Sequence, residues 1–122
     1  MNSVTFELPY PPSVNHYYRH VGPRVLISRE GRQYRDIVSA IVSARGIKTF
    51  DGDVFLSAVF YPPDRRRRDL DNVGGKVLID ALAFAGLFHD DFQIKRINLE
   101  MREPMENGLG VVTIGNLTNA KN

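Results

Sequence analysis

Apolar residues recur at every second position in several short segments, the spacing of a β-strand with one buried face. The first such segment is 4–8, which ends at a cluster of prolines. Segment 54–61 is apolar at almost every position, so both faces of the predicted strand are largely apolar, and we expect it to be central in its sheet. The alternation at 97–101 and 111–114 predicts two later strands, and a short strand is also expected at 25–27.

Two longer segments show helical spacing instead. Ser28 is a suitable N-cap for a helix that ends near Gly46, and a second helix is expected from Asp71 to Ala85. The segment between the first two strands, 13–24, is predicted to be a loop rich in aromatic and cationic residues. This order of elements predicts an α+β (mixed α/β) fold with two main helices against a small mixed sheet.

Composition narrows the class of protein. The chain of 122 residues is expected to form one domain, 1–115, followed by a polar tail, 116–122. It has no cysteine, which excludes disulfides and thiolate metal sites. Neither a secretion signal nor a membrane-spanning stretch is recognisable, so a cytoplasmic location is expected. The net charge of +2 is too small to indicate a polyanionic partner by itself.

The distribution of charge is more informative than its sum. Four consecutive arginines, 65–68, directly precede Asp69 and Asp71, and a second acidic pair, Asp90 and Asp91, follows one helix later. If the first pair is extended, its two side chains point to one side, where a divalent cation would relieve their repulsion. Oxygen ligands without cysteine favour Mg²⁺ or Mn²⁺. Carboxylates that hold such an ion, beside arginines that hold phosphates, suit phosphodiester hydrolysis.

Each of these features also has a simpler interpretation. Arginine runs are usually solvated surface, and Asp71 or Asp90 and Asp91 are often capping or turn residues. Lys76, the lysine of the second helix, can contact a phosphate or lie free on the surface. The three histidines lack metal-binding spacing, and we interpret them as exposed or hydrogen-bonded residues.

Taken together, these residues resemble a known family, the RusA-type Holliday junction resolvases of bacteria and prophages. The resemblance covers nearly the whole chain: the proline-rich segment 8–13, the Arg-Asp-Leu-Asp-Asn sequence at 68–72, Asp-Ala-Leu at 80–82 and the acidic pair at 90–91. It implies a homodimer that binds four-way DNA junctions in recombination and repair and nicks two strands symmetrically with Mg²⁺, for which Mn²⁺ is a possible substitute.

The resemblance also implies roles for particular residues. The essential acids fall on Asp69, Asp71 and Asp91, with Asp90 beside them as a further metal ligand. The family lysine falls on Lys76, although one more residue separates it from the Asp-Leu-Asp-Asn sequence than is usual in the family. A two-fold dimer would match the symmetry of a four-way junction. The candidates for binding DNA share a positive charge: Arg19, Arg24, Arg65, Arg66, Arg67, Arg68, Lys76, Lys95 and Arg96.

Two other functions remain open at this point. The chain is alternatively a catalytically silent module that binds branched DNA, if the extra residue before Lys76 disables the site. It is also alternatively a metal-dependent phosphohydrolase of small nucleotides, although a small nucleotide has too few phosphates to use the arginine run.

Overall fold

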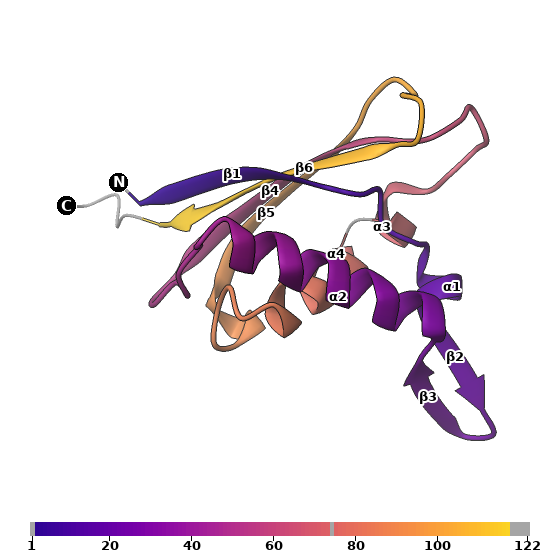
Figure 1. The fold of residues 1–122 in the computed structure, drawn as a ribbon, viewed down its shortest axis with the longest axis horizontal. Coiled ribbons are helices and arrows are strands. Elements are labelled where there is room, and N and C mark those ends of the chain that lie inside the picture. Colours follow the sequence, from indigo (N-terminus) through magenta and orange to yellow (C-terminus); the bar gives the residue numbers. More distant parts are fainter. Residues whose placement is uncertain (1, 74, 118–122) are drawn as a thin grey trace.

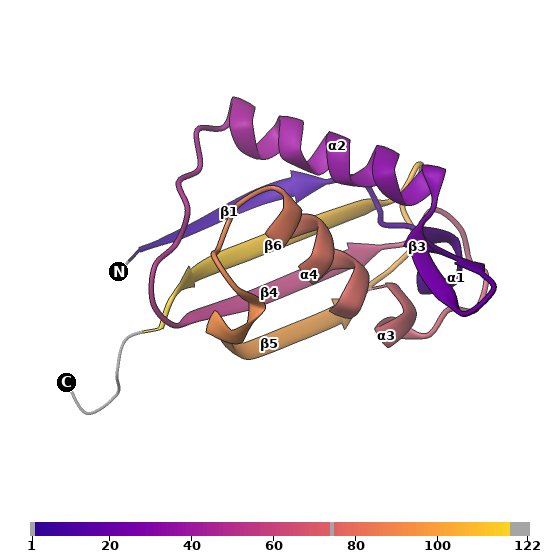
Figure 2. The same ribbon diagram turned by 90° about the horizontal axis from the view of Figure 1, so that it is seen from below.

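A four-stranded sheet with helices on one face forms the body of the protein in the computed structural model, which describes residues 2–73 and 75–117 (Figures 1 and 2). The strand order is β1-β6-β4-β5. Pairing is antiparallel between β1 and β6 and between β6 and β4, and parallel between β4 and β5, so the sheet is mixed as predicted. Its strands are β1 (Ser3–Leu8), β4 (Val54–Tyr61), β5 (Ile94–Met101) and β6 (Leu109–Asn116).

The core lies between this sheet and two long helices, α2 (Arg29–Ala44) and α4 (Gly75–Phe84). β4 is an interior strand, as predicted, and every second residue from Val54 to Phe60 is buried under the helices. The residues between them point to the other face and are only partly buried, although both faces are apolar. The predicted cap of α2 is confirmed, because the Ser28 side chain accepts a hydrogen bond from the Gly31 amide at 2.9 Å. None of the helices in the described ranges is long and apolar enough to cross a membrane.

The prediction of a loop at 13–24 is wrong. This segment contains the short helix α1 (Val14–Tyr17) and the strand β2 (Tyr18–Val21), which pairs with β3 (Arg24–Ile27) in a separate two-stranded sheet. The hairpin extends away from the four-stranded sheet (Figure 1). Because most of its side chains are exposed on both faces, β2 lacks the apolar alternation by which a strand is recognised.

The single helix predicted from Asp71 to Ala85 is divided. The structure has a short helix α3 (Leu70–Val73) and then α4, with Gly74 between them outside the described residues. Of the expected tail, 116–122, residues 118–122 also lie outside the described residues.

Candidate active site

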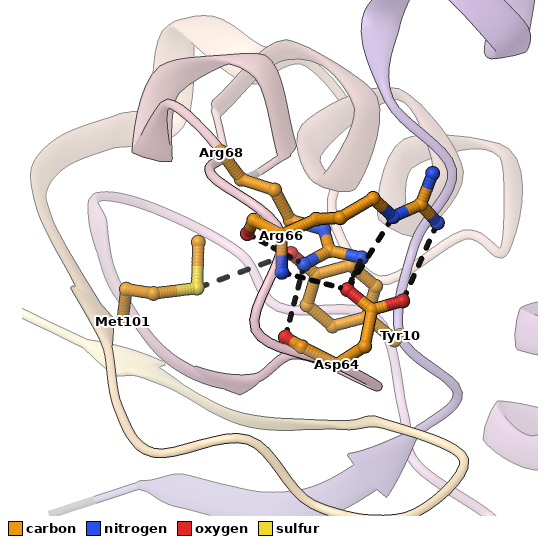
Figure 3. Close-up of polar contacts among 5 residues, drawn as sticks. All are labelled: Tyr10, Asp64, Arg66, Arg68 and Met101. Atoms are coloured by element: carbon orange, nitrogen blue, oxygen red, sulfur yellow. Dashed lines mark hydrogen bonds and ion pairs between the residues drawn. The ribbon is translucent and has the colours of Figure 1, made fainter.

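The arginine-rich loop that follows β4 is folded around one carboxylate (Figure 3). Asp64 forms ion pairs with Arg68 at 2.8 Å and with Arg66 at 3.4 Å, and it also accepts a hydrogen bond from the Arg66 amide at 2.9 Å. The Arg68 guanidinium donates further bonds to the carbonyl oxygens of residues 64 and 66 and lies 5.7 Å from the centroid of the Tyr10 ring. Arg68 therefore holds the loop together, with only 18% of its side chain exposed.

These contacts act on the acidity of Asp64. The hydrogen bond from the Arg66 amide, followed by the bond from Arg68, lowers the pKa of the Asp64 carboxyl to about 2. The carboxylate is thus charged at neutral pH. The loop keeps its internal ion pair, while the side chains of Arg65 and Arg67 form no ion pair or hydrogen bond among the described residues.

Asp69 and Asp71 lie at the start of α3, which follows this loop. The Asn72 amide donates to the carbonyl oxygen of Asp69 at 3.1 Å, so Asp71 is helical and the extended arrangement expected for this pair is wrong. Leu70 packs against the core, and both aspartates are exposed. Asp69 lines a hollow of about 660 Å³ together with Arg66 and other residues of the loop and α1.

The second acidic pair is divided between two roles. The Asp90 carboxylate caps the 3₁₀ helix η1 (Asp91–Gln93) by accepting a hydrogen bond from the Phe92 amide at 2.8 Å. The Gln93 side chain fixes the same turn: its oxygen accepts from the amides of His89 and Asp90, and its nitrogen donates to the carbonyl oxygens of residues 50 and 52. Asp91 is exposed at the outer side of this fixed turn.

Within one chain the two acidic segments do not meet. Helix α3 lies beside the carboxyl end of β5, whereas Asp91 directly precedes its amino end (Figure 2). Eight extended residues separate the two ends, a distance of about 26 Å at roughly 3.3 Å per residue. In the described ranges, no group of three or more histidine or acidic side chains is close enough to hold a metal ion.

Lys76 is exposed near the amino end of α4, the helix that follows the one containing Asp71. Its ammonium nitrogen lies 5.3 Å from the centroid of the Tyr18 ring, a cation–π contact at the base of the hairpin. The next turn of α4 carries Asp80, which accepts a hydrogen bond from the Tyr17 hydroxyl and pairs with Arg35 at 3.1 Å. Burial, and then the bond to Asp80, raise the pKa of Tyr17, so it stays a neutral donor.

The acidic residues divide into those used by the fold and those left available. Asp64, Asp80 and Asp90 are engaged in the contacts described above. The carboxylates of Asp69 and Asp71 accept no hydrogen bond and form no ion pair among residues 2–73 and 75–117, and the same is true of Asp91. Exposed, unpaired carboxylates are the donor set that a hard divalent cation such as Mg²⁺ requires.

The other cationic candidates lie on two elements. Arg19 and Arg24 are exposed on the hairpin, and Lys95 and Arg96 are exposed on β5. Lys95 lies 3.6 Å from the centroid of the Phe92 ring, beside Asp91.

Sequence reasoning missed the residues that position the site. Gln93 secures the turn before β5, and Tyr17 with Asp80 secures α1 against α4. The Tyr17–Asp80 contact and the bonds from the Gln93 nitrogen join residues more than 40 positions apart, so periodicity and spacing give no signal for them. The bonds to the Gln93 oxygen are local: Asp90 and Gln93 form a capping box, whose spacing could have indicated this turn. The interpretation of the histidines as exposed or hydrogen-bonded residues is confirmed: His16 is hydrogen-bonded to the Ser13 hydroxyl at 2.9 Å, and His89 to Asp51 at 2.7 Å.

Comparison with known proteins places these features in a family. The family described as "Endodeoxyribonuclease RusA" matches residues 9–114, from the proline-rich segment to β6. The chain belongs to this family. The matched range includes the arginine-rich loop, α3, α4 and the turn before β5, so the resemblance seen in the sequence is confirmed over the whole candidate site.

Similar RusA proteins occur in bacteria and in phages. The crossover junction endodeoxyribonuclease RusA of Shigella sonnei (strain Ss046) is 44% identical over 95 residues, which cover 77% of this chain and 78% of the relative. The protein of the same name in Escherichia coli (strain K12) is 43% identical over the same extent. That of Enterobacteria phage HK97 is 40% identical over 100 residues, covering 81% of this chain and 82% of the relative.

Proposed function

We propose that this chain is a metal-dependent endonuclease that resolves four-way DNA junctions by paired, symmetric nicks. The observation that carries the proposal is the pair of exposed carboxylates, Asp69 and Asp71, which form no ion pair within the described ranges; Asp69 lines a hollow together with arginines of the loop. Cleavage of a phosphodiester backbone needs cationic side chains to bind the phosphates and carboxylates to hold the catalytic metal. The names of the RusA relatives, crossover junction endodeoxyribonucleases, agree with this chemistry.

The metal in this proposal is Mg²⁺, with Mn²⁺ as a substitute. Asp69, Asp71 and Asp91 would hold the ion, since all three are exposed and their oxygens are unused among the described residues. When bound, the ion supplies Lewis-acid polarisation of the phosphate and a nucleophile at neutral pH. We assign Asp90 to capping the turn that carries Asp91, since its carboxylate is already engaged by the Phe92 amide.

The remaining side chains bind and orient the DNA strand. Arg65 and Arg67 extend freely from the loop and would contact phosphates on either side of the cut. Lys76 lies near the amino end of α4, the helix that follows α3, where it would neutralise the charge that develops on the reacting phosphate, and its contact with the Tyr18 ring limits its freedom. This arrangement leaves Arg68 as the residue that shapes the loop.

The active unit in our proposal is a homodimer, because one chain places its acidic segments at opposite ends of β5. This strand is at an edge of the sheet and carries Ile97, which is 40% exposed, and Phe92 in the turn before the strand is 76% exposed. If two copies associate about a two-fold axis through the middle of β5, the amino end of one strand lies beside the carboxyl end of the other. Asp91 of the partner subunit would then complete the site begun by Asp69 and Asp71.

Cleavage of a synthetic four-way junction tests the function. We expect paired nicks in Mg²⁺ from the wild type, and we expect Asp71→Asn to bind the junction without cutting it. Asp90→Asn is the matched control, because asparagine keeps the capping oxygen and should retain near wild-type cleavage. Cutting by Asp71→Asn would contradict the metal assignment.

Two other outcomes would redirect the proposal. Tight, salt-sensitive junction binding without cutting in Mg²⁺ or Mn²⁺ would favour the silent DNA-binding module. Hydrolysis of small nucleotides, but not of branched DNA, would favour the phosphohydrolase.

A further inference from the structure

The hairpin formed by β2 and β3 is the part of the molecule that the proposed catalytic chemistry leaves unused. It forms a two-stranded sheet of its own and extends from the body beyond α1 (Figure 1). Each strand has four residues, so the hairpin reaches about 13 Å from its base at roughly 3.3 Å per residue. Its turn contains Gly22 with φ 59°, a backbone conformation that two-residue hairpin turns require and glycine adopts freely.

Apolar and cationic side chains share one exposed face of this hairpin. Residues directly opposite each other in an antiparallel pair point to the same side, and the register pairs Arg19 with Leu26 and Val21 with Arg24. These four side chains therefore lie on one face. Val21 is 41% exposed, Leu26 is 36% exposed and both arginines are exposed. A face on which aliphatic and guanidinium groups alternate is unsuited to a protein core.

The base of the hairpin, in contrast, is firmly attached. Tyr18 and Ile27 pack against the hydrophobic core from the opposite face. The Ser28 amide donates to the carbonyl oxygen of Tyr17 at 2.9 Å, and the Arg32 guanidinium donates to that of Ile27 at 2.9 Å. An isolated two-stranded hairpin is barely stable in water, so these contacts at the base give it a fixed direction.

The chemistry of the exposed face fits DNA with interrupted stacking. Guanidinium groups neutralise phosphates, and exposed aliphatic groups are the side chains that enter between base steps and unstack them. Unstacking costs least where the stack is already broken, as at the branch point of a junction. A continuous duplex offers the phosphates but no such opening. The face therefore fits a branch point better than an arm.

We propose that the hairpin enters the branch point of a DNA junction, with Val21 and Leu26 against the bases and Arg19 and Arg24 on the flanking phosphates. This inference rests on the proposed function, because it takes branched DNA as the substrate. It also predicts the position of the nick. Since the Tyr18 ring at the base of the hairpin contacts Lys76, insertion of the tip sets the reacting strand within a few base pairs of the branch.

Fluorescence of 2-aminopurine tests the insertion, since its emission rises when the base is unstacked. We expect the wild type, in EDTA to prevent cutting, to raise the emission severalfold from a probe beside the branch point and to leave a probe in an arm unchanged. The double variant Val21→Ser with Leu26→Ser should bind within about threefold of wild type but lose the rise, since its arginines still hold the phosphates. In Mg²⁺ its cleavage should fall about tenfold.

Two controls separate the hairpin from general surface effects. Ile37→Ser removes an aliphatic side chain that is 45% exposed on α2, and it should behave as wild type. Arg19→Ala with Arg24→Ala should weaken junction binding and reduce the slope of log affinity against log salt by about two, one unit for each phosphate that is no longer neutralised.

Several results would overturn this inference. A hairpin variant that keeps the full fluorescence rise would show that the tip does not unstack the branch. A monomeric hairpin variant in sedimentation would show that the patch binds a second copy of the chain instead. If wild type cuts junctions while the hairpin variant cuts equally well, only the inference fails. If wild type neither binds nor cuts junctions, the proposed function fails, and the inference fails with it.

Discussion

A site shared between two subunits can be tested by mixing two inactive variants. Asp71→Asn removes a ligand at the carboxyl end of β5, and Asp91→Asn removes one at the amino end. In the proposed dimer each site takes Asp71 from one subunit and Asp91 from its partner. A heterodimer of the two variants then has one site with both substitutions and one site with neither.

The size of the recovery follows from this geometry. Random exchange of subunits at equal concentrations gives heterodimers as about half of all dimers, and each has one intact site of two. The mixture should therefore recover about a quarter of the wild-type sites. Because a heterodimer cuts once, we expect singly nicked junctions rather than resolved duplexes during one binding event.

The assay is cleavage of a labelled four-way junction in Mg²⁺, with subunit exchange verified by two affinity tags. Asp69→Asn mixed with Asp71→Asn is the matched control. Both residues come from the same segment, so every site in that heterodimer lacks a ligand and no activity should return. If the first mixture exchanges subunits and stays as inactive as its parents, the acidic residues act within one chain and the reasoning from β5 is wrong.

Three further predictions concern the contacts that shape the site. Gln93→Ala removes side-chain hydrogen bonds to four backbone groups, so we expect urea denaturation to show a free energy of unfolding about 2 kcal/mol lower. Because Asp91 loses its fixed position, the cleavage rate should fall more than the affinity for DNA. Unchanged cleavage would show that this turn does not position a ligand. Arg68→Ala should lower the free energy of unfolding by about 1–2 kcal/mol, because it removes a partly buried, charge-assisted ion pair. Arg65→Ala should change that free energy by less than about 0.5 kcal/mol and should act mainly on DNA affinity. Equal losses of stability in the two variants would contradict this division of roles. The pKa of Asp64 is lowered to about 2, so its stabilising effect is complete above the ordinary pKa of 3.8 and is lost as pH falls through about 2. We therefore expect Asp64→Asn to lower Tm at pH 7 and the difference from wild type to shrink below about pH 4; a constant difference across that range would contradict the assignment.

Much of the fold could be predicted from local pattern. The strands at 4–8 and 54–61 and the helix capped by Ser28 follow from spacing and capping, which depend on neighbouring residues only. Of the hairpin, the short strand expected at 25–27 is confirmed as β3, whereas β2 could not be recognised in this way because most of its side chains are exposed and show no alternation. The helix expected at 71–85 corresponds to α3 and α4, with Gly74 between them outside the described residues.

The same division holds for the candidate site. The sequence alone supplied the candidate residues for the chemistry, because the acidic and basic residue types and their spacing, with the family likeness, are properties of the chain itself. Only the tertiary structure decided how those residues are used. It committed Asp64, Asp90 and Arg68 to internal contacts, and it placed Asp91 at the far end of β5 from Asp71. The physical reason is that hydrogen bonds, ion pairs and strand direction join residues distant in sequence, and no local pattern encodes which of them meet.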